Sequence, residues 1–232
     1  MTNHQVEARL EQVRERIEAA AGRAGRDPDE VEILPVTKGH SVRAIEVVAE
    51  LGLGRIGENR VPEAEVKRSA LGATPGVAWH LIGRLQRNKA RRAARLFDVI
   101  ESVDSVRLAA TLSRIVGEEG LESAEVLVQV NPSGETAKAG VDAGNAMEAV
   151  REICALPGLR VRGLMTMAPF TDDEAVLRPV FRTAARLLSR CRKEVQGFKG
   201  EVLSMGMSND FEIAVEEGST RLRLGTVLLG ER

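Results

Sequence analysis

The sequence contains no tyrosine, and phenylalanine and tryptophan bring the aromatic content to only 3%. Tyrosine is a common general acid or base, so its absence removes one group from the catalytic candidates. Long apolar runs are also missing, since none approaches the roughly 18 residues that a membrane-spanning helix needs. The first residues, Met1-Thr2-Asn3-His4-Gln5, are polar and predict no signal peptide. We therefore expect a soluble cytoplasmic protein that has no membrane partner.

Cysteine and net charge are scarce as well. Cys154 and Cys191 lie in helical patterns without metal-ligand spacing, which predicts two buried free thiols and no metal site. The 33 basic and 34 acidic residues give a formal net charge of −1. This balance argues against nucleic acid or an anionic membrane as the main partner.

The most informative feature is a regular alternation of strand and helix patterns. The chain has 232 residues, 43% of them hydrophobic, which predicts a single domain over residues 1–232. An amphipathic helix is expected from Val6 to Ala24. The expected strands are Val31–Thr37, Arg55–Gly57, Ala78–Ile82, Asp98–Val103, Glu125–Val130, Leu159–Met165, Val202–Met205 and Arg221–Leu224. The expected helices between and after them are Val42–Leu51, Pro62–Ala70, Gln86–Leu96, Val106–Glu119, Ala143–Ala155, Asp173–Val195 and Asn209–Glu217.

Eight strands alternating with helices predict an α/β fold, a single (β/α)8 TIM-type barrel with an extra N-terminal helix. A doubly wound open sheet is the alternative. Pro35 lies inside the first expected strand, where it cannot donate a ladder hydrogen bond. We therefore expect a local bulge there.

Two turns follow the seventh and eighth strands, where barrels of this type often bind phosphate. In the first turn, Gly206 would let the backbone approach a ligand, and Ser208 is a natural N-cap for the next helix. An ordinary helix cap is the alternative, and the Asp210 carboxylate would repel phosphate unless it points away. Gly225 and Thr226 offer N–H and hydroxyl donors in the second turn. Together the two turns predict an anion site.

Lys38 ends the first strand and shares a strand face with Leu34 and Val36. If that face points inward, Lys38 lies at the barrel mouth, where a partly desolvated amine near cationic groups could form an imine. A solvated surface lysine is the alternative. Arg221 and Arg223 share a face of the last strand, which places Arg223 beside the second turn if it points inward. Outward arginines would instead pair with helix acids.

Other polar positions carry weaker signals. Asn59 follows the second strand and could bind a ligand or cap a turn, whereas His80 within the third strand is expected to be a satisfied core histidine. Lys138 lies in a polar loop over residues 131–140, as part of a lid or as a solvated side chain. A basic cluster is expected to form a solvated helix face without aromatic residues for base stacking: Arg84, Arg87, Lys89, Arg91, Arg92 and Arg95.

Taken in order, several segments form a specific set. They are Pro35-Val36-Thr37-Lys38, Gly57-Glu58-Asn59, Trp79-His80-Leu81-Ile82-Gly83, Leu85-Gln86-Arg87-Asn88-Lys89, Val128-Gln129-Val130-Asn131, Glu135 with Lys138 and Gly140, Arg162-Gly163-Leu164-Met165, Leu203-Ser204-Met205-Gly206-Met207-Ser208-Asn209-Asp210 and Arg223-Leu224-Gly225-Thr226. This ordered set resembles the pyridoxal phosphate homeostasis protein family, whose fold is like the N-terminal barrel of alanine racemase.

The resemblance implies that Lys38 holds pyridoxal 5'-phosphate (PLP) as a Schiff base. It also implies that Arg223 faces the pyridine nitrogen. An arginine does not readily give up its proton, so the ring nitrogen would stay largely unprotonated and PLP would be a poor electron sink. The cofactor-binding residues implied in total are Lys38, Asn59, Ser208, Arg223, Gly225 and Thr226.

Three functions compete on this basis. The first is a PLP carrier in intracellular PLP homeostasis, which passes PLP to PLP-dependent apo-enzymes and has no catalytic residue. The second is an amino-acid racemase, which in this fold uses a lysine, an opposed tyrosine and a second β-domain. The third is a lysine-dependent aldolase or a plain phosphate-binding barrel. The lack of tyrosine, and an end at Leu229-Gly230-Glu231-Arg232 about where the barrel closes, favour the carrier and a monomer.

Overall fold

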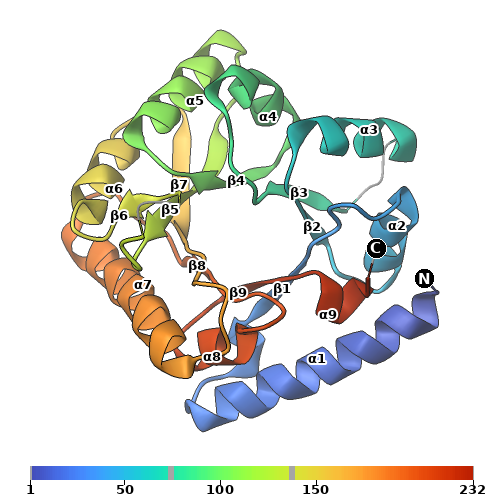
Figure 1. Cartoon of the computed structure of the whole chain (residues 1–232). Helices are drawn as coiled ribbons and strands as arrows, with labels where there is room; N and C mark the ends of the chain where they lie inside the picture. Colours follow the sequence, from blue (N-terminus) through green and yellow to red (C-terminus); the bar gives the residue numbers. More distant parts are fainter. Residues whose placement is uncertain (1, 73–75, 136–138, 232) are drawn as a thin grey trace.

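The computed structural model describes residues 2–72, 76–135 and 139–231. Within these residues, eight parallel strands form the wall of a barrel in the order β1-β9-β8-β7-β5-β4-β3-β2 (Figure 1). The wall strands are β1 Glu32–Pro35, β2 Arg55–Glu58, β3 Ala78–Leu81, β4 Val99–Val103, β5 Ala124–Asn131, β7 Leu159–Met165, β8 Val202–Ser204 and β9 Arg221–Leu224. The expected α/β barrel is confirmed, and the open doubly wound sheet is wrong.

Helices follow the strands and cover the outside of the barrel (Figure 1). They are α1 Asn3–Arg23, α2 Val42–Glu50, α3 Val61–Leu71, α4 Ala90–Leu96, α5 Val106–Glu118, α6 Ala146–Cys154, α7 Glu174–Glu194, α8 Phe211–Glu216 and α9 Thr226–Leu229. The expected strands match the observed ones to within two residues at each end. The sequence pattern missed α9 and β6 Val141–Asp142, a short strand that pairs with β5 beside the wall. In both cases the element is too short to show a period.

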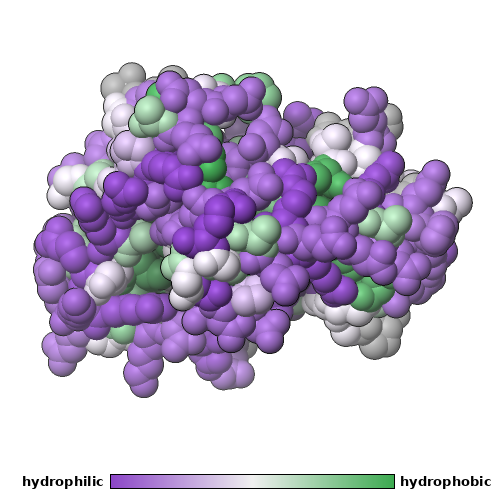
Figure 2. Space-filling view, turned by 90° about the horizontal axis from the view of Figure 1, so that it is seen from below, coloured by the Kyte–Doolittle hydropathy of each residue, from purple (hydrophilic) through white to green (hydrophobic). Residues whose placement is uncertain are grey.

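The N-terminal helix α1 begins at a capping box formed by Thr2 and Gln5. Its apolar residues at three- to four-residue spacing are buried: Val6, Leu10, Val13, Ile17, Ala20 and Ala21. They pack against α8 and α9, and Arg16 donates two hydrogen bonds to Glu212 of α8. The side of the molecule in Figure 2, which looks onto α1, is dominated by hydrophilic residues with small separate apolar spots. Helix α1 thus presents its apolar side to the barrel and its polar side outward.

The barrel closes narrowly between β1 and β2. Strand β1 pairs in unbroken register with β9, from Glu32 opposite Arg221 to Pro35 opposite Leu224. The bulge expected at Pro35 is therefore wrong. The Val36 N–H donates to β9, and the N–H groups of alternate residues point to opposite neighbouring strands. The N–H that Pro35 lacks would therefore point towards β2. The β1–β2 contact is accordingly a single bridge between Val36 and Gly57. The wall there is held by one bridge rather than by a full ladder.

Candidate functional site

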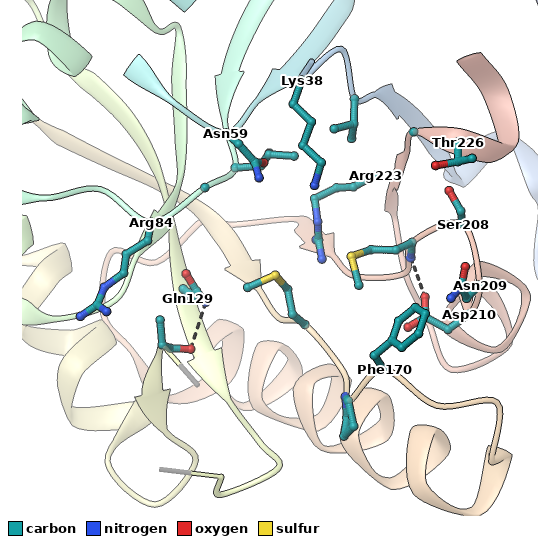
Figure 3. Close-up of a pocket in the computed structure, with 18 of the residues that line it drawn as sticks. Lys38, Asn59, Arg84, Gln129, Phe170, Ser208, Asn209, Asp210, Arg223 and Thr226 are labelled. Carbon is teal, nitrogen blue, oxygen red and sulfur yellow. Dashed lines mark hydrogen bonds between the residues drawn. The ribbon is translucent and has the colours of Figure 1, made fainter. Parts of the chain in front are cut away.

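One cavity of about 460 Å³ lies at the carboxyl ends of the strands and gathers all six predicted binding residues. Lys38 and Asn59 reach it from the ends of β1 and β2, Ser208 from the loop after β8, and Arg223, Gly225 and Thr226 from β9 and the turn after it. Figure 3 shows Lys38 and Arg223 pointing into the middle of the cavity. Ser208 and Thr226 lie together on one side, and Arg84 and Gln129 lie on the opposite side.

Strand parity places Lys38 as expected. Leu34, Val36 and Ile82 form a small apolar cluster inside the barrel, and Val36 also lines the cavity. Lys38 continues the same face two residues beyond Val36, where β1 has ended. Its side chain is half-buried and extends into the cavity (Figure 3). The inward placement is confirmed, and the interpretation of Lys38 as a solvated surface residue is wrong.

Arg223 is buried in the barrel, with 4% of its surface exposed. Its guanidinium donates to the Ser204 hydroxyl at 2.8 Å and to the Thr166 carbonyl oxygen at 2.7 Å. These bonds use two of the five N–H donors of a guanidinium and hold its plane in place. Burial lowers the pKa of Arg223, and the negative charges of Glu101 and Asp210 oppose that effect. Arg223 is thus a fixed donor group in the floor of the cavity.

Beneath Arg223, the barrel interior is charged. The Glu101 carboxylate is fully buried and binds His80 Nδ1 at 2.8 Å, the Arg221 guanidinium at 3.1 Å and the Ser204 hydroxyl at 2.6 Å. Burial alone would raise the pKa of Glu101, but His80 and the two arginines outweigh it and lower this pKa to about 2. Arg221 also bonds Glu32 of β1. His80 is confirmed as a satisfied core histidine, and the outward alternative for Arg221 and Arg223 is wrong.

The two turns after β8 and β9 meet, but in a different way from the one expected. Ser208 is not the N-cap of α8, because Asp210 holds that position. The Ser208 hydroxyl instead accepts a hydrogen bond from the Val227 N–H at 3.4 Å, which joins the two turns. The Asp210 carboxylate accepts the Met207 N–H at 2.6 Å, so it is bound by its own loop. Burial raises the pKa of Asp210, opposed by this bond and by Arg223.

The two glycines of these turns serve different purposes. Gly206 has φ +93°, and a Cβ there would come within 2.6 Å of the Ala214 Cβ, so internal packing requires glycine. The expected approach of the Gly206 backbone to a ligand stays a prediction. At Gly225 a Cβ would meet nothing nearer than the Val36 Cβ, at 3.7 Å. Gly225 therefore leaves open space at the cavity wall that the protein itself does not fill.

Asn59 lies beside the cavity because its backbone is held close to the loop after β3. A Cβ at Gly83 would come within 2.2 Å of the Asn59 carbonyl oxygen, so only glycine fits there. Arg84, next in this loop, is mostly exposed and also lines the cavity. Lys138 lies outside the described residues, and what was expected of it stays a prediction.

The basic cluster does not lie on the face of one helix, as was expected. Arg84 precedes the helix, and Arg87 and Lys89 belong to a 3-10 turn before α4. On α4 itself the arginines pair with acids of neighbouring helices: Arg91 with Glu118 and Glu119, Arg92 with Glu65, and Arg95 with Glu119. These pairs balance the charge of the helix face.

One wall of the cavity was not predicted: the segment after β7 from Met167 to Thr171. Phe170 in this segment lines the cavity mouth with 89% of its surface exposed. In a chain with five phenylalanines this exposure is unusual. The available signal was the apolar run that continues from Met165 through Met167 to Phe170, past the end of the strand.

Metal-binding clusters and membrane-spanning helices are absent from residues 2–72, 76–135 and 139–231. No group of three or more His, Cys, Asp or Glu residues is placed to hold a metal ion there. No helix in the same ranges combines the length and apolarity needed to cross a bilayer. Cys154 and Cys191 are free thiols, Cys191 buried and Cys154 partly so, and burial raises the pKa of each to about 11.

The chain is similar to known proteins over almost its whole length. Residues 8–232 match the alanine racemase N-terminal domain family. The pyridoxal phosphate homeostasis protein of Aquifex aeolicus is 38% identical over 224 residues, covering 97% of this chain and 97% of the relative. The protein of the same name from Escherichia coli K12 is 37% identical over 234 residues, covering 96% and 95% respectively.

A solved structure gives a further match. PipY of Synechococcus elongatus PCC7942, with PLP bound, is 37% identical and superimposes with a TM-score of 0.81. The match covers 93% of this chain and 100% of that chain. By its fold, its family match and its 38% identity over almost the full length of a relative, this chain belongs to the alanine racemase N-terminal domain family and, within it, to the pyridoxal phosphate homeostasis proteins.

Proposed function

We propose that this protein binds PLP in the cavity at the barrel mouth and serves intracellular PLP homeostasis as a cytoplasmic monomer. Lys38 holds the aldehyde as a Schiff base, and Ser208 with the Gly225–Thr226 turn holds the phosphate. Asn59 lies beside the ring, and Arg223 faces the pyridine nitrogen. The observation that supports this best is that these six residues, from four strands, line one cavity of about 460 Å³.

The chemistry of the cavity fits three polar groups of PLP: the phosphate, the aldehyde and the ring nitrogen. The turns at Ser208 and Thr226 form one side and offer hydroxyl and backbone N–H donors, which suit a phosphate. The amine of Lys38 and the guanidinium of Arg223 point into the middle of the cavity (Figure 3). This arrangement suits an aldehyde and a ring nitrogen on one flat molecule. The PLP-bound structure of the related PipY supports this assignment.

The linkage itself is a reversible condensation. The unprotonated Lys38 amine attacks the aldehyde carbon, a C=N bond replaces the C=O bond, and one water molecule leaves. Hydrolysis by water reverses the step and releases PLP together with the free amine. Because no oxidant or further reactant is needed in either direction, the same residue can take up PLP and release it.

Arg223 favours holding PLP over catalysis with it. When bound, PLP supplies an electron sink whose strength depends on protonation of its ring nitrogen. Arg223 is a permanent donor, fixed by Ser204 and Thr166, and a donor cannot protonate that nitrogen as a carboxylic acid partner would. The sequence also has no tyrosine to act as the second base of a racemase. We therefore propose binding and transfer to apo-enzymes without catalytic turnover.

Visible absorbance of the purified protein mixed with PLP tests the proposal. The wild type is expected to develop a Schiff-base band that the Lys38→Ala variant lacks. Lys193→Ala removes an exposed lysine in the last turn of α7 and should keep the band. A wild-type protein that stays colourless with PLP would refute the proposal and favour a phosphate-binding barrel. Chiral chromatography after incubation with alanine tests turnover, and Lys38-dependent racemisation would overturn the carrier assignment.

A further inference from the structure

Three charged side chains lie behind the barrel wall, close to Lys38 but outside the cavity. Glu58 ends β2, and Glu63 and Lys67 lie on α3, which covers this part of the wall (Figure 1). Glu58 is fully buried, and Lys67 has 6% of its surface exposed. Such burial of ionisable groups is expensive, so their contacts need an explanation.

The Lys67 ammonium lies within 2.8 Å of three oxygen atoms. It binds the Thr37 carbonyl oxygen at 2.7 Å, Glu58 Oε1 at 2.7 Å and Glu63 Oε1 at 2.8 Å. The contacts with Thr37 and Glu58 are hydrogen bonds, and the contact with Glu63 is an ion pair. The Thr37 carbonyl belongs to the peptide bond that joins Thr37 to Lys38. Lys67 therefore binds the backbone directly on the N-terminal side of Lys38.

Glu63 binds the backbone on the C-terminal side of Lys38. Its Oε1 accepts the Gly39 N–H at 2.6 Å, and that N–H belongs to the peptide bond after Lys38. The Thr37 hydroxyl donates to Glu58 Oε1 at 2.6 Å, which ties the Thr37 side chain to the same cluster. The peptide groups on both sides of Lys38 are thus bound by one ion pair from α3.

This cluster is poorly explained as a device for stability alone. Replacing a buried ion pair with apolar residues is often neutral or stabilising, because desolvation offsets the attraction. Burial raises the pKa of Glu58 even though Lys67 and Thr37 act against it. Glu58 Oε2 is buried and has no hydrogen-bond partner among the described residues. The charged groups do hold the backbone on both sides of Lys38, whose amine points into the cavity.

We propose that Lys67 and Glu63 are positioning residues that fix the backbone at Lys38 and thereby direct its amine at the bound aldehyde. The inference rests on the proposed function of the cavity. A lysine side chain is a flexible four-carbon stem, so its amine samples a wide volume unless its origin is held. Fixing the origin raises the effective concentration of the amine at the reacting carbon. Neither Lys67 nor Glu63 contacts the ligand in this scheme.

The test uses Glu63→Ala, Glu63→Gln and Lys67→Met. Glu63→Ala removes the acceptor of the Gly39 N–H, whereas the amide oxygen of Glu63→Gln can still accept it. Glu212→Ala is a matched control, because Glu212 also lies in the first helical turn and pairs with a cation. Its side chain is 35% exposed, against 29% for Glu63. Thermal unfolding shows that each variant is folded.

Two ligands separate positioning from general damage. PLP can form the linkage, and its rate is followed by visible absorbance. Pyridoxine 5'-phosphate carries an alcohol in place of the aldehyde and can bind only through its ring and phosphate. Glu63→Ala and Lys67→Met are expected to slow formation of the band about tenfold, the loss of one hydrogen bond to a charged group. Glu63→Gln should recover part of this rate, and the dissociation constant for pyridoxine 5'-phosphate should stay unchanged.

Each outcome separates a positioning role from a structural one. If a variant slows formation of the PLP band and weakens binding of pyridoxine 5'-phosphate by the same factor, the role is merely structural and the inference is overturned. An unchanged rate of band formation in folded Glu63→Ala would also overturn it. If Lys67→Met fails to fold, the two Glu63 variants still decide the question. If the wild type forms the band and the variants form it at the same rate, only the positioning role is refuted. If the wild type forms no band, the proposed function and this inference are refuted together.

Discussion

Glu101→Gln is the substitution for which the structure gives a definite stability change. The Glu101 carboxylate has no exposed surface and faces His80, Arg221 and Arg223, which lower its pKa from the ordinary 4.5 to about 2. The difference between these pKa values corresponds to about 3 kcal/mol of native-state stabilisation at neutral pH. Glutamine keeps the shape and a hydrogen-bond acceptor but lacks the charge. We expect the free energy of unfolding to fall by about this amount at pH 7.

The pH dependence gives a sharper test than the size of the loss. Because the folded pKa lies below the unfolded pKa, the contribution of Glu101 is present above about pH 4.5 and is lost as the pH falls towards 2. Between neutral pH and about pH 3.5 the wild type should lose roughly 1 kcal/mol of stability from this group alone. The glutamine variant cannot lose it, so the two stabilities should converge in acid.

Urea unfolding at several pH values measures both quantities. Glu122→Gln, on an exposed side chain paired with Arg160, controls for the loss of one negative charge. A gap between wild type and Glu101→Gln that stays the same from pH 7 to about 3.5 would show that folding does not lower the pKa of Glu101. That result would refute the charged network beneath Arg223.

Three further substitutions address the cavity. Ser208→Ala removes the hydroxyl that joins the two turns and is expected to weaken PLP binding about tenfold by titration, with little change in melting temperature. Gly225→Ala should leave stability unchanged, because its Cβ meets nothing nearer than 3.7 Å, but should weaken PLP binding by filling the cavity wall; equal affinity would place the phosphate elsewhere. Phe170→Ala should also leave the melting temperature unchanged, since the ring is 89% exposed, and should speed PLP release in stopped-flow absorbance.

Strand parity explains why so much of the site could be predicted from sequence. The alternation of faces is a local property, so Leu34, Val36 and Lys38 had to share one side of β1 once the strand formed. The same rule placed Arg221 and Arg223 together on β9, and the burial of Leu34 decided that both sets face inward. The barrel then brings the ends of β1, β8 and β9 to one place.

The errors arose where tertiary contacts decide between equivalent local choices. Ser208 is a good N-cap by residue type, but the turn after β9 lies close enough to engage its hydroxyl, and Asp210 takes the N-cap position instead. Pro35 could have produced a bulge, but it lies where β1 meets β2 by one bridge only, so its missing donor costs little. The Glu58–Lys67 pair joins β2 to α3, and no local pattern reports such a pairing.

The charged interior explains how Arg223 can stay protonated in a buried place. Below it, acid and base alternate from Arg223 through Ser204 to Glu101, then to Arg221 and to Glu32 at the other end of the strands. Each arginine therefore has a carboxylate nearby, and Glu101 is shared between two of them. An isolated buried guanidinium would be costly and mobile, whereas this one is neutralised from below and held in plane by two hydrogen bonds. Arg223 also lines the cavity, so a ligand there would meet a donor that is already held in place. Under the proposed function, a fixed donor opposite the pyridine nitrogen and a backbone held at Lys38 would both suit retention of PLP.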